Sequence, residues 1–151
     1  MSASSSDPFD LYRFVDAQSP AYTDALAELK GGQKRSHWMW FLFPQVAGLG
    51  SSAMAKRYAI GSRAEAEAYL RHPLLGERLR ECVDALLGLE GRSAEQIMGN
   101  PDFLKLQSAM TLFAEFLPSG SRFEQLLDKY YGGRKDPKTL SFLFQDAPPS
   151  S

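Results

Sequence analysis

The chain has 151 residues, of which 44% are hydrophobic and 23% charged, the size and composition of one globular domain. Its 17 basic and 18 acidic side chains give a formal net charge of -1, which argues against a general attraction to nucleic acid or to an anionic membrane. The single cysteine excludes an intramolecular disulfide. Because the sequence shows neither a secretory signal nor an apolar run of about 20 residues, we expect a cytoplasmic protein with no membrane partner.

The first half of the chain shows helix starts and stops in regular order. Asp7-Pro8 and Ser19-Pro20 each pair a capping residue with a proline suited to the first helical turn. Gly31-Gly32 is a stop signal for the second of these helices. Ser62 is a suitable cap for the segment RAEAEAYLRH, and Pro73 ends it, so this segment is also predicted to be a helix.

The second half of the chain has the same helical character. Residues 74–89 carry apolar side chains with a period of about 3.6 residues, which predicts an amphipathic helix. Ser93 starts a short turn that ends at Gly99, and Asn100-Pro101-Asp102 starts the next helix. Shorter helices are expected after it, toward the C-terminal end.

These elements together predict an all-α fold. Segments of alternating β-branched residues are nearly absent, so strands have little support. We expect one compact domain of about seven or eight short to medium helices that resembles an orthogonal bundle. This domain covers residues 7–145, and the polar, small and proline residues at 1–6 and 146–151 predict disordered tails.

The densest stretch of the sequence is KRSHWMWFLFPQ, residues 34–45, which holds both tryptophans. Residues 38–43 are apolar at every position and fit either a buried strand or a buried helical turn. They include no β-branched residue, Ser36 is a suitable N-cap, and Pro44 is a suitable stop. We therefore predict a short buried helix with polar side chains at its two edges.

Polar and aromatic side chains associated with this stretch form the candidate site. His37 is the candidate acid or base, because an imidazole at the rim of an aromatic cluster suits ligand binding or proton transfer. Lys105, Ser108 and Thr111 follow one another at helical spacing, so they can hold a phosphate or carboxylate, although a solvated helix face explains the same pattern. The predicted ligand-binding residues are Lys34, Trp38, Trp40, Gln45, Tyr58, Lys105 and Ser108.

Other kinds of site find less support in the sequence. Two histidines and one cysteine without metal-ligand spacing predict no metal site, and we expect no cofactor. GLGSSA, residues 48–53, matches a dinucleotide fingerprint but lacks the preceding strand, although its glycine loop still offers N–H groups to an anion. His72 stands at a predicted helix end, where an imidazole can bond the last carbonyls. The apolar helical pattern around Cys82 favours a core residue over a nucleophile.

Several segments of the sequence resemble a bacterial family, domain-of-unknown-function family 1810, whose members often carry the label calpastatin. The matching segments cover roughly residues 7–143 and read DPFDLYRFVDAQ, KRSHWMWFLFPQ, GLGSSAMAKRYAI, EAEAYLRHPLLGERL, LKLQSAMTLF and LDKYYGGRKDPKTL. The resemblance implies a single, mainly helical domain and gives no catalytic residues. Animal calpain inhibitors are disordered in isolation, whereas this chain has 12% aromatic residues and a regular apolar period, so we expect no inhibition of calpain.

The sequence leaves three functions open. The first, which we favour, is the binding of a small anionic or nucleotide-like ligand beside the tryptophan-rich segment, with enzymatic activity left open. The second is a non-catalytic protein–protein interaction module in which a tryptophan anchors the partner. The third and weakest is nucleic-acid binding through the basic loop around Arg134. The sequence specifies no oligomeric state.

Overall fold

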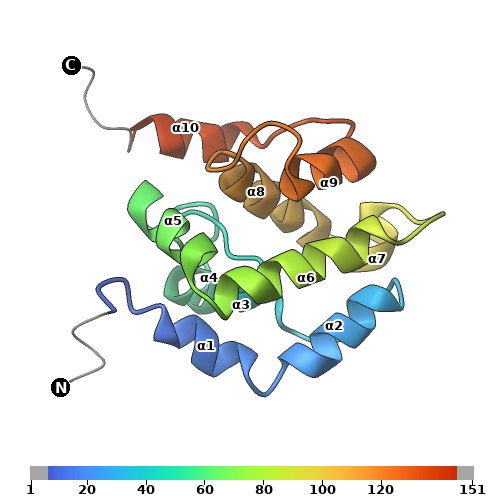
Figure 1. Ribbon diagram of the computed structural model, residues 1–151, viewed down its shortest axis with the longest axis horizontal. Coiled ribbons are helices and arrows are strands. Elements are labelled where there is room, and N and C mark those ends of the chain that lie inside the picture. Colours follow the sequence, from blue (N-terminus) through green and yellow to red (C-terminus); the bar gives the residue numbers. More distant parts are fainter. Residues whose placement is uncertain (1–6, 146–151) are drawn as a thin grey trace.

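The computed structural model describes residues 7–145, and in this part of the chain helices joined by short loops form the whole architecture (Figure 1). These helices are α1 (Tyr12–Gln18), α2 (Tyr22–Lys30), α3 (Met39–Leu42), α4 (Ala53–Arg57), α5 (Arg63–Arg71), α6 (Leu75–Leu87), α7 (Ala94–Met98), α8 (Asp102–Ala114), α9 (Arg122–Tyr131) and α10 (Pro137–Gln145). The all-α prediction is therefore confirmed. The number of helices exceeds the predicted seven or eight because α3, α4 and α7 have only four or five residues each.

Only one element within residues 7–145 departs from helix and loop, an isolated parallel β-bridge between Val46 and Ile60. No helix in that range is both long enough and apolar enough to cross a membrane. The tails predicted at 1–6 and 146–151 lie outside the described residues.

Several helix ends form as their local sequence predicts. The Ser62 hydroxyl accepts a hydrogen bond from the Glu65 backbone N–H at 3.1 Å, which caps α5. Ser93 and Gln96 form a reciprocal capping box at the start of α7. Gly132 ends α9 in the left-handed conformation, with φ of 63°, which costs glycine little because it lacks a Cβ.

The start of α1 differs from the prediction of a helix beginning at Pro8. The Asp7 carboxylate does serve as a cap, but it accepts hydrogen bonds from the backbone N–H groups of Leu11 and Tyr12, at 2.7 and 3.0 Å. Asp10 adopts a left-handed φ of 51°, a conformation that aspartate tolerates better than most residues. The residues after Asp7 thus form a turn, and α1 begins only at Tyr12.

The centre of the core is α8, which packs against α5, α7, α9 and α10. In the view of Figure 1, α8 lies between α10 above it and α6 below it. The Phe113 ring of α8 lies 5.4 Å from that of Tyr69 and 6.0 Å from that of Phe123, measured between ring centroids. Cys82 of α6 is buried, and this burial raises the pKa of its thiol to about 12. The thiol thus stays protonated at neutral pH, as expected of a core residue rather than a nucleophile.

Candidate functional site

The loop between α2 and α3 is held by one carboxylate, that of Glu28. Its Oε1 accepts hydrogen bonds from the backbone N–H groups of Arg35 and Ser36 and from the Trp38 indole Nε1–H, at 2.8, 2.9 and 2.9 Å. Its Oε2 accepts the hydroxyl of Ser36 at 2.6 Å. The buried helical turn predicted within residues 38–43 is confirmed as α3, but Ser36 does not cap it because its hydroxyl is bound to Glu28.

These hydrogen bonds also determine the charge of Glu28. Burial by itself raises the pKa of this carboxyl, but the hydrogen bonds from Ser36, Arg35 and Trp38 outweigh burial and lower the pKa to about 2. Glu28 is therefore ionised at neutral pH. It fixes the chain segment that carries Lys34 and His37, although no feature of the sequence singled it out.

Two of the predicted ligand-binding lysines meet at the start of α8. The Lys34 Nζ lies 3.0 Å from Oδ2 of Asp102, and the Lys105 Nζ lies 3.3 Å from its Oδ1. The three side chains are largely covered, with exposed fractions of 10% for Lys34, 19% for Asp102 and 28% for Lys105. The Lys34 backbone N–H also donates to the carbonyl of Ile97 at 2.7 Å, which fastens this segment to α7.

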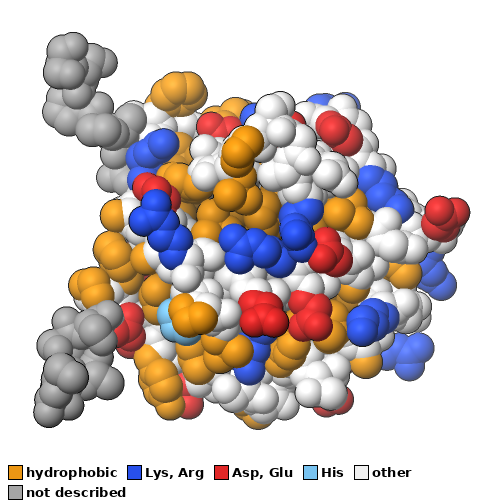
Figure 2. Space-filling view, viewed as in Figure 1, with side chains coloured by type: hydrophobic (Ala, Val, Ile, Leu, Met, Phe, Trp, Pro, Cys, Tyr) orange, Lys and Arg blue, Asp and Glu red, His pale blue; other side chains and the backbone are white. Residues whose placement is uncertain are grey.

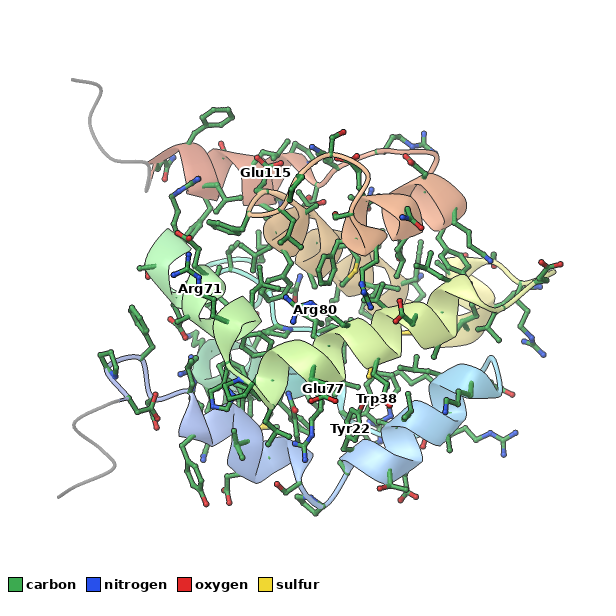
Figure 3. All side chains as sticks on the ribbon, in the orientation of Figure 1. Tyr22, Trp38, Arg71, Glu77, Arg80 and Glu115 are labelled. Carbon is green, nitrogen blue, oxygen red and sulfur yellow. The ribbon has the colours of Figure 1, made fainter. Side chains whose placement is uncertain are left out.

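The two tryptophans have different surroundings. Trp38 is 1% exposed and lies in the strip between α2 and α6 in the view of Figure 3, so it belongs to the core. Trp40 is half-buried, and the Lys105 Nζ lies 5.6 Å from the centroid of its ring. The Lys34 Nζ lies in the same way 5.2 Å from the centroid of the Trp38 ring. We call Lys34, Trp40, Asp102 and Lys105 the lysine cluster.

Three other predicted residues do not join the lysine cluster. His37 is exposed, and within residues 7–145 its side chain makes no hydrogen bond or ion pair. Gln45 is half-buried, and its carbonyl accepts the Ile60 backbone N–H at 2.8 Å, beside the β-bridge. Tyr58 is buried, and its ring packs at 5.6 Å from that of Phe41.

Ser108 and Thr111 are also buried, so the polar strip predicted on this helix is not a solvated face. The Ser108 hydroxyl donates to Oδ2 of Asp136 at 2.9 Å, and the Thr111 hydroxyl accepts the Asp136 backbone N–H at 2.9 Å. The same Oδ2 accepts the backbone N–H of Thr139 at 3.2 Å and caps α10. The two hydroxyls therefore fasten α10 to α8, while Lys105 remains with the lysine cluster.

Asp102 is the member of the cluster that sequence reasoning missed as a site residue. Its pairing with Lys105 could have been found, since the two are three residues apart at the start of a predicted helix. Its pairing with Lys34 could not have been found in this way. Lys34 precedes α3 and Asp102 follows α7, so only the fold brings the two side chains together.

Comparison with known proteins places this fold and sequence in a family. The chain is similar to the conserved hypothetical protein Rv1873 from Mycobacterium tuberculosis, with 55% identity, and the match covers 91% of this chain and 99% of that chain. The crystal structure of that protein has the same fold, with a TM-score of 0.89. No curated protein matches the chain. The family described as protein of unknown function (DUF1810) matches residues 8–143, nearly the whole sequence, and the chain therefore belongs to this family.

Proposed function

We propose that this protein binds a small anionic ligand at the lysine cluster. One observation carries the proposal: the ammonium groups of Lys34 and Lys105 share the single carboxylate of Asp102. The three side chains together therefore keep a net charge of one positive unit. Each ammonium has three donor hydrogens, and Asp102 is the only polar partner that either has among the described residues. Donors therefore remain for a phosphate or a carboxylate.

The surroundings of these charges favour a ligand that also carries a ring. The half-buried indole of Trp40 lies beside Lys105 and offers an aromatic surface on which a nucleobase or a similar ring can stack. Partial burial of the ammonium groups strengthens their attraction to an anion, because water screens them less. A nucleotide-like ligand combines both features.

We assign binding, and no catalytic step, to the lysine cluster. His37 is the predicted acid or base, but it is exposed and makes no hydrogen bond or ion pair with the other described residues. A group that transfers a proton must be within hydrogen-bonding reach of the reacting atoms. We therefore assign no catalytic step to this residue.

Nucleic-acid binding through the loop around Arg134 receives less support. The Lys129 ammonium donates to the carbonyls of Leu87 and Leu89, and Lys135 pairs with Glu115 at 3.2 Å. These cations are thus partly occupied within the molecule. Figure 2 shows basic and acidic side chains next to one another on the face formed by α5 and α6, without a uniformly basic surface there.

A thermal-shift screen with pyrophosphate, AMP, ADP and sugar phosphates tests the proposal. A ligand at 100 times its dissociation constant should add about 2.7 kcal/mol to the free energy of unfolding. Lys105→Met should remove the shift, whereas Lys30→Met, at the exposed end of α2, should leave it unchanged. Asp102→Asn should tighten anion binding about tenfold or more, because it removes a competing carboxylate.

Two results would contradict the proposal. One is the absence of a shift with every compound, which would favour the non-catalytic interaction module instead. The other is a shift that Lys105→Met and Lys30→Met reduce equally, since the anion would then bind elsewhere.

A further inference from the structure

A second candidate site lies between the segment before α1 and the C-terminal end of α5. A cavity of about 740 Å³ is lined there by residues 7–12, by Val15 of α1, and by Ala68, Arg71 and His72. Small-molecule sites have volumes of about 300–1,000 Å³, so the size is suitable. The cavity contains none of the lysine-cluster residues and none of the predicted ligand-binding residues.

The guanidinium of Arg13 joins the two walls of this cavity. Its Nη1 donates to the carbonyls of Phe9 and Asp10, at 2.6 and 2.9 Å, and so fixes the turn before α1. Its Nη2 donates to Oε2 of Glu65 on α5 at 2.8 Å. Because these bonds exist within the protein itself, a ligand need not organise the walls on binding, which favours affinity.

Two polar groups of the cavity wall are committed to the backbone, the Asp7 carboxylate and Nδ1 of His72. The carboxylate of Asp7 accepts the N–H groups that start α1. Nδ1 of His72 accepts the backbone N–H groups of Leu74 and Leu75, each at 3.2 Å, so the imidazole caps the start of α6, and only the backbone N–H of His72 bonds the last carbonyls of α5. The proton of the neutral imidazole must then sit on Nε2, which has no partner among the described residues.

Arg71 adds a second set of donors to the same wall. Its side chain is 82% exposed and lies 3.7 Å from Glu67, a distance at which the pair is weak. Figure 3 shows Arg71 on α5. The guanidinium can present two parallel N–H groups to a carboxylate. Donors thus come from the α5 side, whereas the acids Asp7 and Asp10 come from the opposite wall.

We infer that this cavity binds a small monocarboxylate with an apolar or aromatic body. The carboxylate accepts hydrogen bonds from Nε2–H of His72 and from Arg71, and the body lies against the apolar lining of Phe9, Leu11 and Val15. A second carboxylate on the ligand would face Asp7 and Asp10 and be repelled, which is why the class is a monocarboxylate. This site is separate from the lysine cluster, so the inference does not depend on the proposed function.

Isothermal titration with three naphthalene derivatives tests the inference. Naphthalene-2-carboxylate should bind with one-to-one stoichiometry, and the carboxamide and the aminomethyl compound with the same ring should bind at least about tenfold more weakly. Arg71→Met should weaken binding of the carboxylate about tenfold. Arg92→Met is the matched control, because the loop between α6 and α7 lies at the other end of the molecule (Figure 1), and it should change nothing.

Ala68→Phe gives an independent readout, since it fills the cavity without altering His72 or Arg71. The variant should keep the helical circular dichroism of the parent and lose the binding of naphthalene-2-carboxylate. Lys105→Met should retain it, which separates this site from the lysine cluster. The inference is overturned if no naphthalene compound binds, if the aminomethyl compound binds as tightly as the carboxylate, or if Ala68→Phe binds like the parent.

Discussion

Arg13→Met is expected to lower the free energy of unfolding by about 3–5 kcal/mol, the usual cost of breaking a buried ion pair by removing one partner. The side chains of Arg13 and Glu65 are only 15% and 9% exposed. Without the guanidinium, a largely buried carboxylate loses its counter-ion. The backbone carbonyls of Phe9, Asp10, Arg57 and Ala59 each lose one hydrogen bond from the guanidinium as well.

Urea unfolding followed by circular dichroism measures this effect. The matched control is Arg71→Met, which removes an exposed ion pair on α5 and should cost less than about 0.5 kcal/mol. Arg13→Met combined with Glu65→Leu should recover part of the loss, because no unpaired charge is then left inside. A loss below about 1 kcal/mol for Arg13→Met alone would mean that water replaces the guanidinium, and it would contradict a stabilising role for the Arg13–Glu65 pair.

Glu28→Gln is expected to cost about 2–3 kcal/mol at pH 7, because charge-assisted hydrogen bonds are replaced by weaker ones. The amide oxygen of glutamine can still accept the three N–H groups at the Oε1 position, and its NH₂ group then faces the Ser36 hydroxyl, so the cost comes mainly from the lost charge. Since Glu28 positions the segment with Lys34 and His37, the variant should also weaken anion binding at the lysine cluster.

The same carboxylate predicts a specific acid sensitivity. The pKa of Glu28 is lowered in the folded protein from 4.5 to about 2, so its contribution to stability is complete above about pH 4.5 and is lost as the pH falls toward 2. Urea titrations at pH 7, 4 and 3 should therefore show a smaller difference between parent and Glu28→Gln at each lower pH. Glu90→Gln, at an exposed acid of the α6–α7 loop, is the control and should run parallel to the parent. If the difference in free energy of unfolding between the parent and Glu28→Gln were the same at all three pH values, the lowered pKa of Glu28 would be contradicted.

The features that sequence reasoning predicted best are those whose partners are near in the chain. Ser62 and Ser93 cap their helices through N–H groups three residues ahead, so the sequence alone contains both members of each pair. The burial of residues 38–43, Trp40 excepted, is predictable for a similar reason, since six consecutive apolar side chains favour removal from water whatever surrounds them.

Features that depend on distant partners could not be predicted in the same way. Ser108 looked available for a ligand because its helix alone does not reveal that Asp136 and α10 cover it. The two tryptophans looked equivalent, and the burial of Trp38 depends on a carboxylate of the preceding helix, that of Glu28. The cavity beside α1 was missed because Asp7-Pro8 reads as a helix start, whereas the left-handed φ of Asp10 turns this segment into a cavity wall.

Anion binding at the lysine cluster is tested most directly by the two indole N–H resonances in a ¹H–¹⁵N correlation spectrum during titration with ADP or pyrophosphate. Trp40→Phe assigns them, since the chain has two tryptophans. The Trp40 signal should shift and saturate, and the signal of Trp38, whose N–H is bound to Glu28, should move much less. In Asp102→Asn, the shift of the Trp40 signal should saturate at a lower concentration of ADP or pyrophosphate. In Lys105→Met, this shift should disappear. Two stationary resonances at millimolar ADP and pyrophosphate, or equal shifts that Lys105→Met does not change, would contradict binding at this cluster.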